Sequence, residues 1–402
     1  MTEIFALAAL WLALALAATL ISIWLGIATA MSEIVVGTVA QLVLGAVIGG
    51  AVLGTDQSWV RFLSSTGAVL LTFLAGAELD PSVLRQSWKQ TCGVGMIGFV
   101  APFFGCTAVA YYVLGWSVSS SWLAGIALST TSVAVVYAVM LEFGFNRTHY
   151  GKTILAACFV NDLATVLALG LMFSPFTFKT LIFVVASVVA FTILPWLTPR
   201  FFQRFGQRPS ELEAKFLLLC MFGLGALALW ADSEPVLPAY LMGMVLAGSV
   251  GKDTVLVRRL RTLTMGFLTP FYFIRAGSFV SVPALIAAPA AFVVLLLAKM
   301  ASKIAGVYPM TKVFGSPTKE GIYTTLMMST GLTFGSISAL FGLTHGIISN
   351  AQYSYLIAAV VASAVVPTLI ANAFFLPRHL LPAGAPARTI EDALAGAKGE
   401  PR

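Results

Sequence analysis

One acidic residue, Asp162, stands in the middle of a long apolar segment, ILAACFVNDLATVLALG. Of the sixteen Asp and Glu residues, the other fifteen fall at the ends of apolar segments, between them or in the tail. A charged side chain at mid-membrane costs at least about 2.5 kcal/mol, so an acid there indicates function by default. Burial favours the protonated acid and a bound cation favours the carboxylate, so H⁺ and a monovalent metal cation compete for the same oxygens. Such competition is the chemistry of cation/proton antiport, and a merely hydrogen-bonded structural Asp is the alternative.

Three basic residues also fall inside apolar segments: Arg275, Lys299 and Lys303. The two lysines are four positions apart and therefore share one face of a helix. We expect one of them to face the Asn161–Asp162 pair and both to compensate charge near the ion. Snorkelling or hydrogen bonding between helices is the alternative role for Arg275 and Lys299.

Two further segments carry small hydroxyl residues at mid-depth. Hydroxyl groups and glycine can satisfy an unwound backbone, and the freed carbonyls can coordinate a dehydrated cation. The pattern therefore predicts two interrupted helices that cross near Asp162, whereas ordinary Ser/Thr bonding within intact helices is the alternative. The residues concerned are Ser129, Thr130, Thr131 and Ser132 in the first segment, and Ser329, Thr330, Gly331 and Thr333 in the second.

The composition indicates that these residues are held by membrane helices. The 402-residue chain is 59% hydrophobic and 10% charged, against roughly 25% charged residues in soluble domains. Its apolar segments are long enough to cross a hydrocarbon core about 30 Å thick, and we count thirteen of them in an all-α, polytopic membrane protein. The basic residues lie in short loops, which argues against nucleic acid as a partner, and the four cysteines lack zinc or disulfide spacing.

Basic residues are unevenly distributed between the alternate loops. With the N-terminus outside, eighteen Lys and Arg residues fall on the cytoplasmic side, two (Arg61 and Lys179) on the opposite side, and three inside segments. The positive-inside rule therefore predicts an outside N-terminus and a cytoplasmic C-terminus in the inner (plasma) membrane.

The two halves of the chain resemble each other. Segments 39–54 and 237–251, 70–80 and 271–281, and 128–136 and 328–336 match in pattern, and the members of each pair are seven segments apart. Because seven is odd, the members cross the membrane in opposite senses. This arrangement predicts inverted-topology repeats, which are typical of secondary transporters.

Several segments carry a family resemblance: LLTFLAGAELDPSVL, STTSVAVV, FVNDLATVLALG, KIAGVYP, MSTGLTFGSISALFGL and SAVVPTLIANAFF. In them, and in order over residues 4–377, the chain resembles the sodium/proton exchangers, the monovalent cation:proton antiporters. The similarity is greatest to the bacterial branch of potassium efflux antiporters. The resemblance implies a transmembrane antiporter domain, 1–377, in which a core moves like an elevator against a dimer-forming scaffold. The core would comprise 88–172 and 284–377, and the scaffold 4–79 and 177–281.

The same resemblance implies roles for single residues. Asp162 would be the ion-carrying aspartate, Asn161 its motif neighbour, Lys303 the basic residue of the core and Thr131 the hydroxyl of the crossed helices. Thr130, Ser132 and Thr330 complete the expected cation- and proton-binding set. Lys299 joins Lys303 as an expected charge-compensating residue.

Three positions depart from the family pattern. Electrogenic members carry a second aspartate where Asn161 stands, whereas electroneutral members usually have arginine at the position of Lys303 and glutamate at that of Ala157. With no second carboxylate to neutralise it, Lys303 should lie near Asp162. The missing aspartate favours electroneutral exchange, and the choice between Na⁺ and K⁺ stays open.

The sequence after the last span is short and rich in Ala, Pro and Gly. Family members that release potassium carry a large nucleotide-binding regulatory domain, but residues 378–402 contain no GxGxxG motif. We therefore expect a short cytoplasmic tail without gating of that kind.

The function predicted from the sequence is secondary active transport. A passive monovalent-cation channel is the alternative, and it would need a continuous polar file instead of one acidic site. Motifs of membrane-embedded enzymes such as HExxH and GxSxG are absent from the sequence. We expect no cofactor besides the transported Na⁺ or K⁺ and H⁺, and as partners these ions, membrane lipids and a second copy of the chain.

Overall fold

The structure is a computed structural model, and it describes residues 2–25, 28–48, 53–77, 86–145, 148–173, 177–206, 211–231, 233, 235–251 and 253–381. Most of the expected tail, from residue 382 onward, lies outside these ranges. The described ranges are helical and contain no strand. An all-helical architecture follows directly from the chain's long apolar runs, because a helix satisfies its own backbone hydrogen bonds inside a bilayer.

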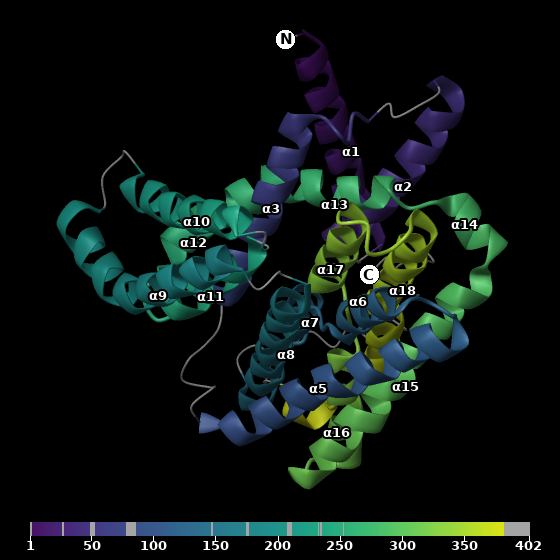
Figure 1. The fold of residues 1–402 in the computed structure, drawn as a ribbon. Coiled ribbons are helices and arrows are strands. Elements are labelled where there is room, and N and C mark those ends of the chain that lie inside the picture. Colours follow the sequence, from purple (N-terminus) through teal and green to yellow (C-terminus); the bar gives the residue numbers. More distant parts are fainter. Residues whose placement is uncertain are drawn as a thin grey trace, which may run out of the picture.

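Figure 1 shows the helices coloured in chain order. Their bounds are α1 Thr2–Leu25, α2 Thr29–Ile48, α3 Ser58–Ala77, α5 Trp88–Ala108, α6 Val118–Ser129, α7 Val133–Glu142, α8 His149–Phe173, α9 Phe178–Phe205, α10 Leu212–Trp230, α11 Val236–Leu246, α12 Thr254–Leu263, α13 Thr269–Ser278, α14 Val282–Ala287, α15 Pro289–Val313, α16 Thr318–Met328, α17 Thr333–Thr344 and α18 Asn350–Ile370. Three π-helical turns, Val109–Val113, Thr264–Leu268 and Ala371–Phe375, extend α5, join α12 to α13 and extend α18.

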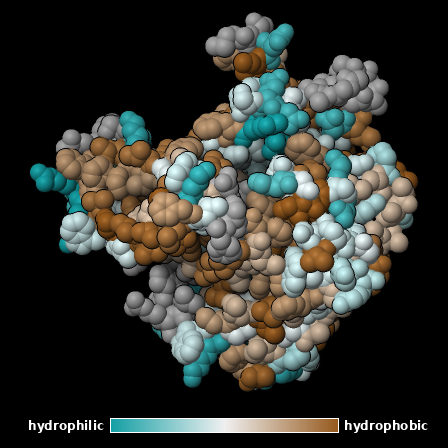
Figure 2. Space-filling view, viewed as in Figure 1, coloured by the Kyte–Doolittle hydropathy of each residue, from teal (hydrophilic) through white to brown (hydrophobic). Residues whose placement is uncertain are grey.

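Membrane-spanning helices dominate the described part of the chain. Nine candidate spans are long and apolar enough to cross a bilayer, and three shorter apolar helices accompany them: Thr29–Leu44, Val118–Ser129 and Val236–Leu246. The multi-span prediction is therefore confirmed, whereas the count of thirteen stays a prediction. Apolar side chains also face outward over much of the lobe formed by α9 and its neighbours (Figure 2). Such a surface suits acyl chains rather than water.

The helices pack in two groups, which Figure 1 shows as a lobe with α9–α12 and a larger body with α5, α8 and α15–α18. In the body, α5 packs against α6, α8 and α15, and α18 packs against α15 and α17. Among the other helices, α3 packs against α11 and α13, and α2 packs against α13. The largest buried hydrophobic cluster lies mainly in the body and includes Phe103, Leu128, Phe159 and Met328.

Glycines bring α3 and α11 into direct backbone contact. A Cβ atom on Gly76 would meet the carbonyl oxygen of Tyr240, and one on Gly243 would meet that of Phe73. Each glycine thus faces the carbonyl of the residue three positions before the opposing glycine. Close approach of this kind is what small residues provide at helix interfaces in membranes.

The same arrangement recurs where α2 crosses α13. A Cβ on Gly277 would meet the carbonyl oxygen of Ile34, and one on Gly37 would meet that of Ile274, with the same three-residue offset. The two crossings are therefore copies of each other, as expected from the repeat. One detail of the sequence pairing was wrong: the α2 glycine that corresponds to Gly243 is Gly37, which lies just before the segment 39–54.

Replacing Gly243 with alanine should destabilise the fold, because the new methyl group has no space against the backbone of α3. Gly223→Ala in α10 is the matched control, since a Cβ there meets nothing within 4 Å. Alanine in an exposed helix is favoured over glycine by about 1 kcal/mol. We expect Gly243→Ala to lower the melting temperature of the detergent-solubilised protein and Gly223→Ala to keep or raise it. Equal melting temperatures would contradict the close crossing.

Candidate functional site

Two helices of the body are interrupted and meet at their breaks. The first ends as α6 at Ser129 and resumes as α7 at Val133. The second ends as α16 at Met328 and resumes as α17 at Thr333. Both breaks occur at the hydroxyl clusters, so the prediction of two crossed, broken helices is confirmed.

Hydrogen bonds join the two breaks directly. The Thr131 hydroxyl donates to the Met328 carbonyl oxygen at 2.9 Å, and the Ser132 amide approaches the Thr330 hydroxyl oxygen at 3.4 Å. Thr130 lies in the same break, and its hydroxyl donates to the Ala127 carbonyl at 3.0 Å. The crossing thereby brings together the C-terminal ends of α6 and α16, each carrying roughly half a negative charge from its helix dipole.

The neighbouring helix α8 carries both Asn161 and Asp162, and Asn161 binds this crossing directly. The Asn161 side-chain oxygen accepts a hydrogen bond from the Thr131 amide at 3.0 Å. Asp162 is buried, with 1% of its surface exposed, and its Oδ1 atom has no hydrogen-bond partner. A buried carboxylate oxygen without a donor is costly unless a proton or a cation satisfies it. The chemistry of this position therefore suits a proton or a cation.

Lys303 reaches the same crossing from α15. Its ammonium donates to the Thr131 hydroxyl oxygen at 3.1 Å, and the side chain is fully buried. As expected, Lys303 lies near enough to Asp162 for their charges to interact, although within the described part of the chain no direct ion pair joins them. The direct partner of the ammonium is the Thr131 hydroxyl, which itself donates to the last carbonyl of α16, so the negative end of that helix dipole also stabilises the charge.

Lys299, one turn earlier on α15, contacts the other side of the crossing. Its ammonium lies 3.3 Å from the Thr130 carbonyl oxygen and 2.9 Å from the Ser363 hydroxyl oxygen, and it is fully buried. The hydrogen-bonding role that we gave as the alternative for this lysine is therefore present. Ser363 of α18 was missed by the sequence analysis, because a single serine in an apolar helix gives no signal.

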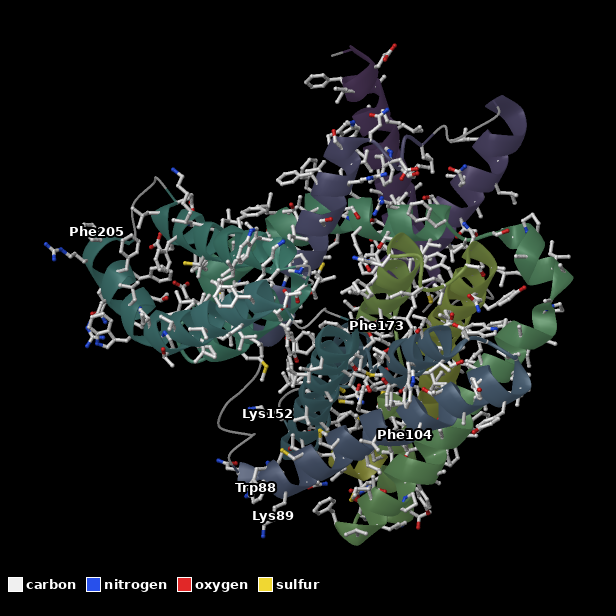
Figure 3. All side chains as sticks on the ribbon, in the orientation of Figure 1. Trp88, Lys89, Phe104, Lys152, Phe173 and Phe205 are labelled. Atoms are coloured by element: carbon white, nitrogen blue, oxygen red, sulfur yellow. The ribbon has the colours of Figure 1, made fainter. Side chains whose placement is uncertain are left out.

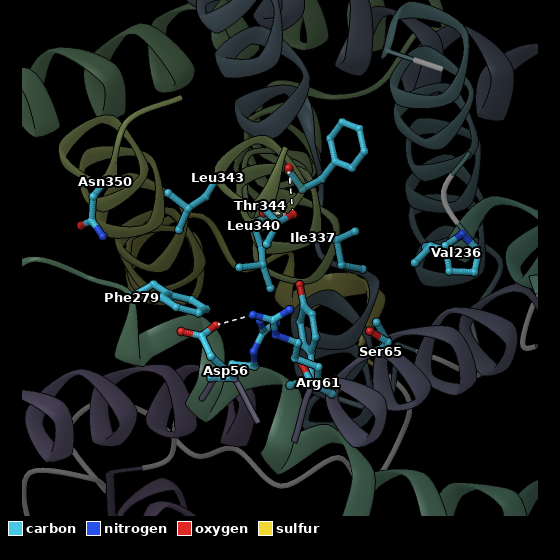
Figure 4. Close-up of a pocket in the computed structure, with 16 residues that line it drawn as sticks. Asp56, Arg61, Ser65, Val236, Phe279, Ile337, Leu340, Leu343, Thr344 and Asn350 are labelled. Atoms are coloured by element: carbon cyan, nitrogen blue, oxygen red, sulfur yellow. Dashed lines mark hydrogen bonds and ion pairs between the residues drawn. The ribbon is translucent and has the colours of Figure 1, made fainter. Parts of the chain in front are cut away.

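Arg275 lies away from the crossing and lines a cavity. Its Nε donates to the Thr55 carbonyl at 2.9 Å, and its guanidinium stacks on Phe279 with 5.0 Å to the ring centroid. The cavity, about 560 Å³, is bounded by α3 and α13 on one side and α17 on the other, and the Asp56–Arg61 ion pair at 3.0 Å lies beside it (Figure 4). A hydrogen bond from α13 to the turn before α3, together with the stacking on Phe279, thus accounts for this buried charge.

A second cavity, about 580 Å³, lies among the starts of α5, α8 and α16. Its lining includes Ala157, which is one helical turn before Asn161, together with Tyr150 and Glu320. The Tyr150 hydroxyl donates to the Glu320 carbonyl at 3.0 Å, and His379 pairs with the Glu320 carboxylate at 2.9 Å. Ala157, the position at which the resemblance implies a glutamate in electroneutral members, therefore lies at the wall of a cavity one turn from Asn161.

A second buried acid was overlooked. Glu33, in the second turn of α2, is only 2% exposed. We had placed it at the end of a span, because the apolar run that begins at Ile34 marks the segment more strongly than the turn before it. The helix starts earlier, at Thr29, so Glu33 lies within the helix and is buried.

Comparison with known proteins shows which family the chain matches. A family model described as "Sodium/hydrogen exchanger, transmembrane" matches residues 11–376. The chain is 22% identical over 354 residues to a probable Na⁺/H⁺ antiporter 3 of Methanocaldococcus jannaschii, covering 85% of this chain and 89% of that protein. It is 28% identical over 357 residues to a Na⁺/H⁺ antiporter of Enterococcus hirae, with 84% and 91% covered.

Other similar proteins extend this comparison. The glutathione-regulated potassium-efflux system protein KefC of Salmonella arizonae is 26% identical over 352 residues, which cover 78% of this chain and 53% of that protein. Among solved structures, the sodium proton antiporter MjNhaP1 of Methanocaldococcus jannaschii at pH 8 superposes with a TM-score of 0.67. It shares 15% identity and covers 92% of this chain and 96% of its own, so the likeness concerns the fold.

Removing the Thr131 hydroxyl should loosen the crossing. Thr131→Val keeps the shape of the side chain but leaves the Met328 carbonyl and the Lys303 ammonium without this partner, and each buried unsatisfied group costs about 1–3 kcal/mol. Thr131→Ser, which keeps the hydroxyl, is the control. We expect a lower melting temperature for Thr131→Val than for Thr131→Ser in detergent. A valine variant as stable as the serine variant would show that the hydroxyl does not hold the breaks together.

Proposed function

Because this chain belongs to the sodium/hydrogen exchanger family, we propose that it is a secondary antiporter that exchanges Na⁺ or K⁺ for H⁺ at Asp162. The observation that carries the proposal is the buried Asp162 oxygen without a hydrogen-bond partner, one residue from the Asn161 side chain that binds the crossing. The names of the relatives, which are Na⁺/H⁺ antiporters and a potassium-efflux protein, support the same class of substrate.

The proposed exchange follows from competition for one carboxylate. Protonated Asp162 is neutral and tolerates burial, whereas ionised Asp162 needs a cation beside it. Hydroxyls and carbonyls of Thr130, Thr131, Ser132 and Thr330 at the two breaks are available as further oxygen ligands. Only one of the two ions then binds at a time, which couples their movements, and no cofactor is needed.

An elevator-type movement would carry this site across the membrane. In this proposal the core, 88–172 and 284–377, holds the crossing and slides against the scaffold, 4–79 and 177–281. The cavity of about 560 Å³ supports the proposal, because α3 and α13 of the scaffold and α17 of the core all line it. A passive channel is not favoured, since the crossing presents one acidic site between broken helices and not a continuous polar file.

We further propose the plasma membrane, a cytoplasmic C-terminus and a homodimer. Figure 3 supports the orientation: Lys89 at the start of α5 and Lys152 near the start of α8 lie at the same end of the molecule, while Phe173 lies at the other end of α8. The position of these two lysines at one end agrees with the positive-inside rule. The apolar outer surfaces of α1 and α9 suit either lipid or a second copy.

Replacing Asp162 with asparagine should abolish exchange, because it removes both the titratable group and the charge that balances the cation. We expect proteoliposomes with Asp162→Asn to show only the proton flux of protein-free liposomes when Na⁺, Li⁺, K⁺ or Rb⁺ is added to a pH-gradient dequenching assay. Glu3→Gln, which changes an exposed acid at the start of α1, should leave exchange intact. Substantial cation-dependent flux in Asp162→Asn would sink the single-carboxylate mechanism.

Exchange should be electroneutral. The Lys303 ammonium rests on the neutral Thr131 hydroxyl, so a cation that binds Asp162 does not have to displace it. One H⁺ then moves for each cation, and a cation gradient on a solid-supported membrane should produce no sustained current. A sustained current that disappears in Lys303→Gln while exchange persists would contradict this prediction. It would mean that Lys303 releases a second proton.

A further inference from the structure

We propose that the ammonium of Lys299 is a built-in cation that permanently fills a second cation position at the helix crossing. The position at Asp162 is then the one left for exchange. This inference deepens the proposed function and rests on it, but it concerns the opposite side of the crossing. Its starting point is a buried charge that the exchange at Asp162 does not use.

The surroundings of the Lys299 ammonium are those of a cation site. Its ligands are an oxygen freed by the break, the Thr130 carbonyl at 3.3 Å, and the Ser363 hydroxyl oxygen at 2.9 Å. Uncharged oxygens of unwound backbone and hydroxyl groups are the ligands with which broken membrane helices hold monovalent cations. Across the described residues no carboxylate pairs with Lys299, so the α6 dipole and these oxygens carry its charge.

Gly331 fits closely around the same ammonium. A Cβ on Gly331 would meet the Lys299 nitrogen, and would lie 3.1 Å from the Thr130 hydroxyl oxygen and 3.2 Å from the Ser363 oxygen. The position thus has no room for even a methyl group on this side. A glycine at this point of the second break is required by the lysine, and the two residues form one packed unit.

The internal repeat relates the two sides of the crossing. Residues 128–136 correspond to 328–336, so Thr131 corresponds to Gly331. In the first half Asn161 of α8, the helix after the broken pair α6 and α7, binds the Thr131 amide. In the second half Ser363 of α18, the helix after the broken pair α16 and α17, approaches the Gly331 carbonyl oxygen at 3.4 Å.

The two sides differ in where the charge resides. Next to Asn161 stands Asp162, which supplies a fixed negative charge for a mobile cation. The neighbours of Ser363 are Ala362 and Ala364, which carry no charge. On this side the positive charge belongs to Lys299, whose side chain extends from α15. Hence one side holds an exchangeable ion and the other a permanent one.

The proposal is tested by removing the tethered charge and measuring equilibrium binding of radioactive Tl⁺ to the purified, full-length protein. We expect about one Tl⁺ per chain for the wild type, about none for Asp162→Asn, about two for Lys299→Ala and about one for the double variant Lys299→Ala/Asp162→Asn. Lys299→Met is the matched control, because it fills the space without the charge and should bind no more Tl⁺ than the wild type. No additional Tl⁺ in Lys299→Ala would overturn the proposal.

Two further outcomes are informative. If wild-type binding does not depend on Asp162, the proposed exchange site fails, whereas a gain of Tl⁺ in Lys299→Ala still supports the built-in cation. If Lys299→Ala is poorly folded, we expect K⁺ to restore a monodisperse protein and choline, which is too large, not to restore it. Failure in both salts would overturn the proposal, because a free cation could then not replace the ammonium.

Discussion

The structure depends on satisfying the backbone where two membrane helices are broken. In hydrocarbon each free carbonyl is costly, and no water is available to bind it. The crossing resolves this for α6 and α16 by hydrogen bonds between the breaks, through Thr131 and Met328, and by two ammonium groups from α15. The other helices of the body pack around the crossing, hold these atoms in place and keep water away from them.

Some residues of this site could be predicted from the sequence because their polarity differs from that of the apolar segments around them. Asp162 and the lysines are charges inside apolar runs, and the runs of Ser, Thr and Gly at 129–132 and 329–333 interrupt an otherwise uniform pattern. These signals predicted the breaks, the crossing and the residues around them. Helix spacing also predicted that Lys299 and Lys303 share a face, but it could not predict the partner of each, since a flexible four-carbon chain reaches several atoms.

Other parts depend on three-dimensional contacts that leave little trace in sequence. Ser363 and Glu33 look ordinary in their segments, yet both become buried polar residues once the helices pack. The repeat was visible as similar patterns, but the register of Gly37 with Gly243 follows from backbone contact and not from flanking residues. The direct contact of Lys303 with the Thr131 hydroxyl could not be predicted for a related reason, because the potential of a helix dipole does not belong to any single residue.

The bond between Thr131 and Met328 joins residues 197 positions apart. During synthesis the first break enters the bilayer long before its partner is made, and the nascent chain cannot complete either half alone. The hydrogen bonds that complete the first break can therefore form only after α15 and α16 have been synthesised. Folding of this protein thus ends with a late, cooperative step, in which helices from the last third of the chain complete the helix break in the first third.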